Sequence, residues 1–552
     1  MGSSLAELQK SGVFTAKLPP DPAFETPESS HQAPRETLGP RLVKGALYTF
    51  VRPEPTKATE LLGVSPKAMM DLGLKPGEEH TPEFEALVSG NSINWTEESG
   101  GIYPWAQCYG VVHGQASWAM GLFECTNPDT HIRYELQLKG AGRTPYSRFA
   151  DGKAVVRSSI REYVVSEALS ALGVPTTRAL SITLLPQSKV LRERIEPGAI
   201  VARFAESWLR IGTFDLPHAR GDRDTVRKLA TFAAEEVFHG WEALPAIVSL
   251  GKDHPPDAVE NPARDVPWDQ IQHHQGVEEN RFARLYREIA RRNAKTVAAW
   301  QAYGFMNGVL NTDNTSIYGE LMGAGDKVDD PSFVKEGLAE ESMPAVVERA
   351  EAIIERTSDE FRTVFLNEYK HLMGKRLGLK SRKESDFQHL FSELLDTLEA
   401  LELDFNHFFR RLSHIPLTAI ETEDQRKDTA PVFFHEEGFG GIGYTDETAK
   451  ERIGNWLDSW RARILEDWGP DEDQQRQEAM KAVNPKFLPR GWVLDEVIER
   501  VERRGDRVIL EQVMRMALNP CEDTWGLDKK LEERFCGDVP RFQRAMMCSC
   551  SS

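Results

Sequence analysis

The sequence predicts an α+β fold in two lobes, a smaller one that mixes strands with one helix and a larger one that is mostly helical. Apolar and polar residues alternate over residues 132–138, which is typical of a half-buried strand. An apolar stripe at a spacing of four follows over residues 155–172 and indicates a helix. From residue 222 onward, apolar side chains recur mainly at helical spacing.

The N-terminal part divides into three predicted segments. Residues 1–37 are rich in Pro, Ser and charge and predict a disordered arm. Residues 38–100 predict an ordered N-terminal extension, with short helices between 61 and 74 that are broken by Pro66 and Gly73. Residues 101–215 form the strand-rich lobe, in which we expect a hairpin over 190–204 around the turn-type sequence Glu196-Pro197-Gly198.

The remainder of the chain predicts helices. Residues 216–415 form the helical lobe, with a long helix from about 278 to 303 and further amphipathic helices over 340–415. Residues 416–552 form a C-terminal helical extension. It starts with a Gly- and charge-rich connector over 416–447, and ends in the tail Cys548-Ser549-Cys550-Ser551-Ser552.

The composition excludes several classes of protein. The chain has 552 residues, and 86 Asp and Glu against 67 Lys and Arg give a net charge of −19, which argues against nucleic-acid or anionic-membrane binding. No apolar run approaches the ~18 residues of a membrane span, so we do not expect the chain to be an integral membrane protein. Six cysteines are too few for a secreted disulfide scaffold. The N-terminus contains Ser but is not Arg-rich, so it is a weak mitochondrial transit peptide.

One Lys and one Glu stand where kinase-type sites need them. Lys139 ends the predicted strand, Gly140-Ala141-Gly142 follows it, and Glu162 lies on the next helix. In kinases a strand Lys holds nucleotide phosphates and a helical Glu fixes the position of that Lys. The spacing alone leaves open that both side chains are simply exposed.

A second candidate centre lies in residues 306–317, where the helix ending near residue 303 enters a polar loop. This loop contains Asp313 and Asn314. In a kinase catalytic loop an Asp orients or deprotonates the acceptor hydroxyl, and an Asn oxygen binds Mg²⁺. An Asx-turn cluster without catalytic function is the alternative for this loop.

The string LKGAGRTPYSRFADGKAVVRSSIREYVVSEAL over residues 138–169, followed by GVPTTRALSI, resembles the hallmark of the selenoprotein O (YdiU) family. The similarity runs from about residue 38 to the C-terminus. It implies a protein-kinase-like (pseudokinase) fold with a helical C-terminal extension. It also implies transfer of AMP from ATP, with Mg²⁺, to Ser, Thr or Tyr hydroxyls of proteins. Eukaryotic members of the family imply a mitochondrial location, with the cytoplasm as the alternative.

The resemblance also implies roles for individual residues. Lys139 would hold phosphates and Glu162 would orient it, whereas Asp313 would take the acceptor's proton and Asn314 would bind the metal. The remaining implied sites are nucleotide contacts at Asp151 and Gly152, a clamp on the terminal phosphate at Arg203 and Arg210, and redox thiols at Cys548 and Cys550.

The chain departs from the family pattern at two places. Residues 109–121 read YGVVHGQASWAMG and lack most of the family's glycine-rich loop. After Gly319 a block of several dozen residues is missing, and Gly323 stands where a metal-binding Asp is expected. These departures keep three alternatives open: an inactive pseudoenzyme or redox-linked scaffold, a phosphotransferase on the same site, and a mis-spliced or mispredicted transcript. Loss of such a block also predicts exposed core surface.

Overall fold

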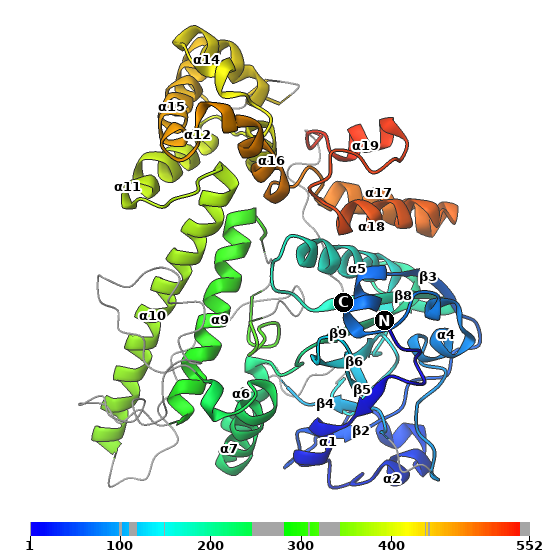
Figure 1. Cartoon of the computed structure of the whole chain (residues 1–552). Coiled ribbons are helices and arrows are strands. Elements are labelled where there is room, and N and C mark those ends of the chain that lie inside the picture. Colours follow the sequence, from blue (N-terminus) through cyan, green and yellow to red (C-terminus); the bar gives the residue numbers. More distant parts are fainter. Residues whose placement is uncertain are drawn as a thin grey trace.

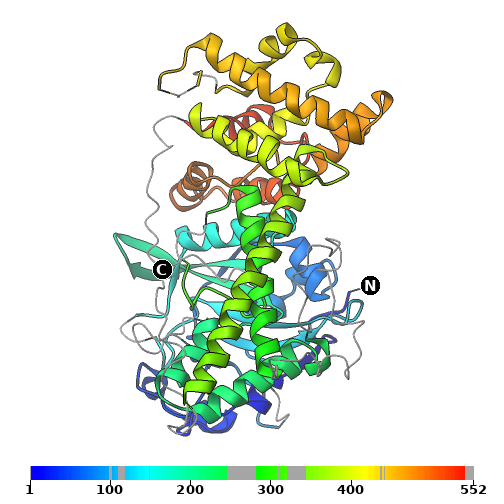
Figure 2. The same cartoon turned by 90° about the vertical axis from the view of Figure 1, so that its left-hand side faces the viewer.

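The computed structural model describes residues 2–98, 102–109, 119–147, 150–244, 281–306, 310–319, 343–435, 438–439 and 442–540. A part built on an antiparallel sheet lies below a helical part in the view of Figure 1. Two long helices, α9 (Arg281–Tyr303) and α10 (Met343–Leu377), run beside the sheet and up into the helical part, as Figure 2 shows from the side. No helix in the described ranges has the length and apolar character needed to cross a bilayer.

The sheet has nine strands among the described residues, and its main path runs β2-β4-β5-β6-β9-β8-β3. The predicted strand is confirmed as β6 (Arg133–Lys139), which lies between β5 and β9. The other strands are β1 (Gln9–Ser11), β2 (Tyr48–Phe50), β3 (Glu60–Val64), β4 (Trp105–Gln107), β5 (Ala119–Thr126), β7 (Ala154–Val155), β8 (Arg178–Leu191) and β9 (Ile195–Ala205). The prediction of short helices between residues 61 and 74 is therefore wrong for its first residues. Residues 61–64 belong to β3, which pairs with β8, and α3 (Pro66–Leu72) begins only after that strand.

The predicted disordered arm is also wrong where the structure describes it, over residues 2–37. Strand β1 pairs with β5, and helices α1 (Val13–Lys17) and α2 (Pro27–Gln32) follow. The Glu124 carboxylate on β5 accepts hydrogen bonds from the backbone N–H groups of Val13 (3.0 Å) and Phe14 (2.7 Å). The segment folds because Leu8, Phe14 and Leu18 are all buried, which a count of Pro, Ser and charge does not reveal.

The hairpin of β8 and β9 is confirmed, but its turn is not where the sequence predicts. Leu191 faces Ile195, so the chain reverses over residues 192–194, and Glu196-Pro197-Gly198 belongs to β9. Glu196 is buried and pairs with the Arg157 guanidinium at 3.1 and 3.2 Å. A β-bulge in β8 before Lys189, which faces Pro197, accommodates the proline in the strand.

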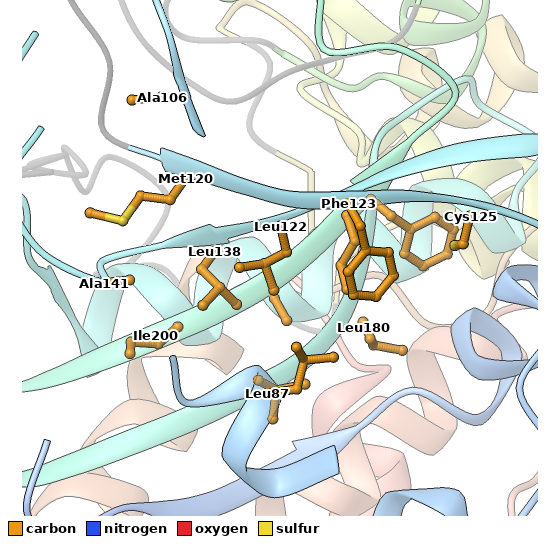
Figure 3. Close-up of a cluster of buried hydrophobic side chains, with 14 of the residues drawn as sticks. Leu87, Ala106, Met120, Leu122, Phe123, Cys125, Leu138, Ala141, Leu180 and Ile200 are labelled. Atoms are coloured by element: carbon orange, nitrogen blue, oxygen red, sulfur yellow. The ribbon is translucent and has the colours of Figure 1, made fainter. Parts of the chain in front are cut away.

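Both faces of the sheet are covered. On one face, side chains of β5, β6, β8 and β9 form a core with α3 and α4 (Pro82–Val88), and Figure 3 shows part of this cluster, including Leu122, Leu138 and Leu180. On the other face lies α5 (Val156–Ala171), the predicted helix, in a core that also contains α17 (Gly491–Arg504) and α18 (Val508–Leu518). The C-terminal extension therefore packs directly on the helix that carries Glu162.

The helical part has its own core. Buried Trp456 and Trp460 of α15 (Asp446–Asp467) lie in it with Phe408 of α13 (Phe405–Leu412). The predicted connector over 416–447 is not simply irregular, because it contains α14 (Glu423–Thr429). The other helices are α6 (Ile211–Ala219), α7 (Arg223–Phe232), α11 (Glu384–Asp386), α12 (Glu393–Ala400), α16 (Asp473–Val483) and α19 (Lys529–Phe535).

Candidate active site

Lys139, Glu162 and Arg203 meet between the sheet and α5. The sheet register places Gln137 opposite Arg203 and Lys139 opposite Val201, so both cations lie on adjacent strands. The Lys139 ammonium donates to Glu162 Oε2 at 2.7 Å, and the Arg203 guanidinium donates to Glu162 Oε1. The Lys–Glu contact expected from the sequence is therefore present, and Arg203 joins it on the second carboxylate oxygen.

The two cations keep Glu162 ionised. Burial by itself raises the pKa of this carboxyl group, but the charges of Arg203 and Lys139 outweigh burial, and the pKa falls from 4.5 to about 2. The cluster carries two positive charges against one negative charge. This excess of positive charge beside a loop of small residues is suited to anionic phosphates.

The second arginine lies along the chain from the first. The Arg203 guanidinium stacks on the Trp208 ring, 4.4 Å from its centroid, and the Arg210 guanidinium lies 3.9 Å from the centroid of Tyr109. Trp208, Arg210 and Gln137 line one small hollow. Arg203 Nε and Gln137 Oε1 are buried and have no hydrogen-bond partner in the part of the chain that the structure describes. The hollow has a volume of only about 10 Å³, which is room for one water molecule, so it is not itself a nucleotide pocket.

Asp313 is held at the N-terminus of α6. The backbone N–H groups of Ile211 and Gly212 donate to the carbonyls of Thr315 (3.0 Å) and Thr312 (2.8 Å). Asp313 Oδ1 then lies so close to Gly212 that a Cβ added there would overlap it. Because Arg210 immediately precedes α6, this helix start brings Arg210 and the candidate catalytic loop together.

The structure adds a second carboxylate that the sequence analysis missed. Asp215 lies one helical turn after Gly212, and burial raises its pKa, aided by the negative charge of Asp313 and opposed by a hydrogen bond with Thr312. A helical Asp three residues after a glycine is a weak sequence signal, and only the contact between α6 and the loop connects Asp215 with Asp313.

Asp151 and Gly152 lie beside the Gly140–Gly142 turn. The Arg192 guanidinium donates to both Asp151 oxygens, at 2.9 and 3.0 Å, and the Lys153 N–H donates at 3.0 Å. Burial raises the pKa of Asp151, but these contacts reverse the effect and lower it. Gly152 has φ +69° and its carbonyl accepts from the Gly142 N–H at 3.1 Å. Asp151 is thus tied to the hairpin turn and not to the Lys139 cluster.

A Mg²⁺ ion fits the loop only if it is shared with nucleotide phosphates. Asp313 and Asn314 are consecutive residues that each carry a side-chain oxygen, but no group of three His, Cys, Asp or Glu side chains that could hold a metal occurs among the described residues. Such a donor pair suits Mg²⁺, which commonly takes one or two protein oxygens and completes its shell with phosphates and water.

Several predicted features lie outside the described residues. These are the redox thiols Cys548 and Cys550, the altered loop over 110–118, and the region after Gly319 that includes Gly323. The described cysteines are all unbridged, with Cys108 and Cys125 buried and Cys521 and Cys536 half-buried.

Comparison with known proteins decides the family. The family model for protein adenylyltransferase SelO matches residues 45–326 and 332–518. The chain belongs to the SelO family. A mitochondrial protein adenylyltransferase SelO of Schizosaccharomyces pombe is 35% identical over 617 aligned positions, which cover 100% of both chains. The mitochondrial SelO of Saccharomyces cerevisiae is 30% identical and covers 93% of this chain and 92% of its own. The protein nucleotidyltransferase YdiU of Aromatoleum aromaticum is 31% identical, over 93% and 95%.

Membership in the SelO family supports nucleotidyl transfer as the class of reaction and ATP as the implied substrate. The names of the relatives state an enzyme class and say nothing about individual side chains. The roles of Lys139, Arg203, Arg210 and Asp313 therefore remain proposals that rest on the geometry described above.

Proposed function

We propose that this chain transfers AMP from ATP to hydroxyl side chains of proteins and releases pyrophosphate. The observation that carries the proposal is the ion-paired cluster of Lys139, Glu162 and Arg203, one short segment away from Arg210 and Asp313 at the start of α6. A cation cluster next to a carboxylate is the arrangement that phosphate-group transfer to a hydroxyl requires.

Each residue has one task in the proposed reaction. Lys139, Arg203 and Arg210 bind and orient the phosphates, and Glu162 holds Lys139 and Arg203 in place. Asp313 accepts the proton of the acceptor hydroxyl. The acceptor oxygen forms a bond to the α-phosphorus while the bond to the bridging oxygen breaks, and pyrophosphate leaves. When bound, Mg²⁺ near Asn314 would neutralise phosphate charge.

A labelling assay with the full chain tests the proposal. The chain and a generic acceptor protein are incubated with Mg²⁺ and ATP labelled at either the α- or the γ-phosphate. We expect label from the α position, abolished by Asp313→Ala and retained by Asp359→Ala, a control at an exposed position. Label from the γ position alone would show a phosphotransferase. No transfer by a folded chain would favour the inactive pseudoenzyme.

We also infer where in the cell the chain is located from the names of its relatives. Its two yeast relatives carry mitochondrial names, which supports a mitochondrial location. A fusion of the full chain to a C-terminal fluorescent protein should colocalise with a mitochondrial dye. Diffuse fluorescence would favour the cytoplasm.

A further inference from the structure

An apolar cleft of about 570 Å³ lies between α6, α7 and α9. Its walls are mainly apolar and include Phe214, Val226, Leu285 and Ile317, and Tyr286 lines it with nearly half of its surface exposed. The volume falls in the range of pockets that take up a drug-sized ligand or several side chains. None of the reaction steps proposed above uses it.

The cleft and the candidate catalytic loop share helix α6. Gly212 and Asp215 face the loop around Asp313, whereas Phe214 and His218 line the cleft. His218 is close enough to lower the pKa of Asp215, and Asp313 is close enough to raise it. Because the whole of α6 is only about 13 Å long, a peptide with a hydroxyl at Asp313 can reach the cleft within a few residues.

The charges at the cleft select its partner. Arg223 and Arg227 line it, are exposed, and form no ion pair with another described residue. None of the described residues that line the cleft carries a carboxylate, although the chain as a whole has a net charge of −19. An apolar cleft with two available guanidinium groups is complementary to an apolar side chain flanked by carboxylates.

We propose that this cleft docks the acceptor protein. A large apolar side chain within a few residues of the modified hydroxyl enters the cleft, and neighbouring Asp or Glu residues pair with Arg223 and Arg227. This inference rests on the proposed transfer to protein hydroxyls. It adds a sequence preference for the acceptor, namely acidic segments with an apolar anchor near the hydroxyl.

Binding can be measured without the reaction. The full chain, without ATP, is titrated into a fluorescein-labelled 15-residue peptide with one Tyr, one Leu four residues away and three Glu, and the anisotropy gives the Kd. We expect Arg223→Glu with Arg227→Glu to weaken binding at least tenfold. The matched control is Arg503→Glu with Arg504→Glu, since these arginines are also exposed on one helix. A peptide with Gln in place of Leu should lose affinity to a similar degree.

Two results would overturn the docking proposal. One is an unchanged Kd after both arginines are reversed. The other concerns a photo-crosslinker at position 286 in the presence of saturating peptide. If it reacts only with residues of this chain, the chain itself fills the cleft and the peptide does not enter it.

The assay also keeps the two proposals apart. A peptide that binds through the arginines but receives no α-label contradicts the transfer reaction and supports docking. A labelled peptide whose Kd ignores the arginines supports the transfer reaction and contradicts docking.

Discussion

At the scale of single residues, Glu162 balances two cations at once. Its contacts with Lys139 and Arg203 explain why a carboxyl group with only 14% of its side chain exposed keeps a pKa near 2. The kinase-type layout of a strand Lys followed by a helical Glu predicted the first of these contacts, although the spacing alone left open that both side chains are exposed. It could not predict the second, because Arg203 reaches Glu162 only through the register of β6 and β9.

The depressed pKa of Glu162 predicts a specific pH dependence of stability. The unfolded state takes up the proton near pH 4.5 and the folded state only near pH 2, so the stabilisation is complete above pH 4.5 and is lost as the pH falls toward 2. It amounts to about 3 kcal/mol. Urea unfolding of wild type and Glu162→Gln between pH 7 and 3 measures it, and the difference between them should shrink at low pH. Glu511→Gln, at an exposed position, is the control.

Gly212 is predicted to be essential for the position of Asp313. A Cβ at this position would overlap Asp313 Oδ1 and lie 3.2 Å from the Thr312 carbonyl oxygen. Gly212→Ala should therefore displace the loop and lower kcat by about 10²-fold, the effect of a shift of about 1 Å. Steady-state α-label transfer measures kcat and KM. Gly454→Ala in α15, where the nearest atom is 3.6 Å away, should leave both unchanged. Equal rates for Gly212→Ala and wild type would contradict the assigned position of Asp313.

At the scale of elements, the C-terminal helices support α5. The Arg161 guanidinium of α5 pairs with Asp495 of α17 across 334 residues of sequence, and both helices share one core with α18. The helical periodicity predicted α5 and a helical C-terminal unit. It could not show that the two pack together, because side-chain periodicity identifies an apolar face and not its partner.

This packing predicts that a cavity in α18 destabilises the nucleotide side of the molecule. Leu510 is buried in the shared core, so Leu510→Ala should lower the free energy of unfolding by about 2–5 kcal/mol. Amide hydrogen exchange should also accelerate in α5. Val508→Ala, two residues away and 59% exposed, should change stability by less than about 0.5 kcal/mol. An unchanged rate of amide hydrogen exchange in α5 would contradict the prediction, because it would show that the stability of α5 does not depend on α18.

At the scale of the whole molecule, backbone hydrogen bonds hold the end of the candidate catalytic loop against the start of α6. Ile317 donates its backbone N–H to the Leu209 carbonyl, and residues 320–342 lie outside the described part of the chain. Ile317 also lines the apolar cleft, whereas the expectation that a missing block exposes core surface concerns residues beyond Gly319 and stays a prediction. That prediction rests on matched segments on both sides of the gap in the sequence, whereas the shape and charge of the cleft depend on how α6, α7 and α9 pack, which the sequence does not reveal.

A single buried arginine connects the long helices to the C-terminal extension. The Arg376 guanidinium in α10 donates to the Ala302 carbonyl, to Asn484 Oδ1 at 2.8 Å and to Asn406 Oδ1 at 3.0 Å. Burial lowers the pKa of this group to about 10, and its Cζ atom lies 4.0 Å from the centroid of the Phe409 ring. Its hydrogen-bond partners in the described part of the chain are all neutral, so the hydrogen bonds and ring contacts must offset the cost of burying the charge.

Arg376→Leu tests which of these effects is larger. The substitution leaves the two asparagine oxygens and one carbonyl without their donor, so we expect the free energy of unfolding to fall by about 3 kcal/mol. Urea denaturation followed by tryptophan fluorescence measures the change. Arg362→Leu, on the same helix with 75% of its side chain exposed, should be near neutral. If Arg376→Leu is as stable as wild type, the desolvation of the guanidinium costs as much as its three hydrogen bonds contribute. The arginine would then fix which helices meet without adding to stability.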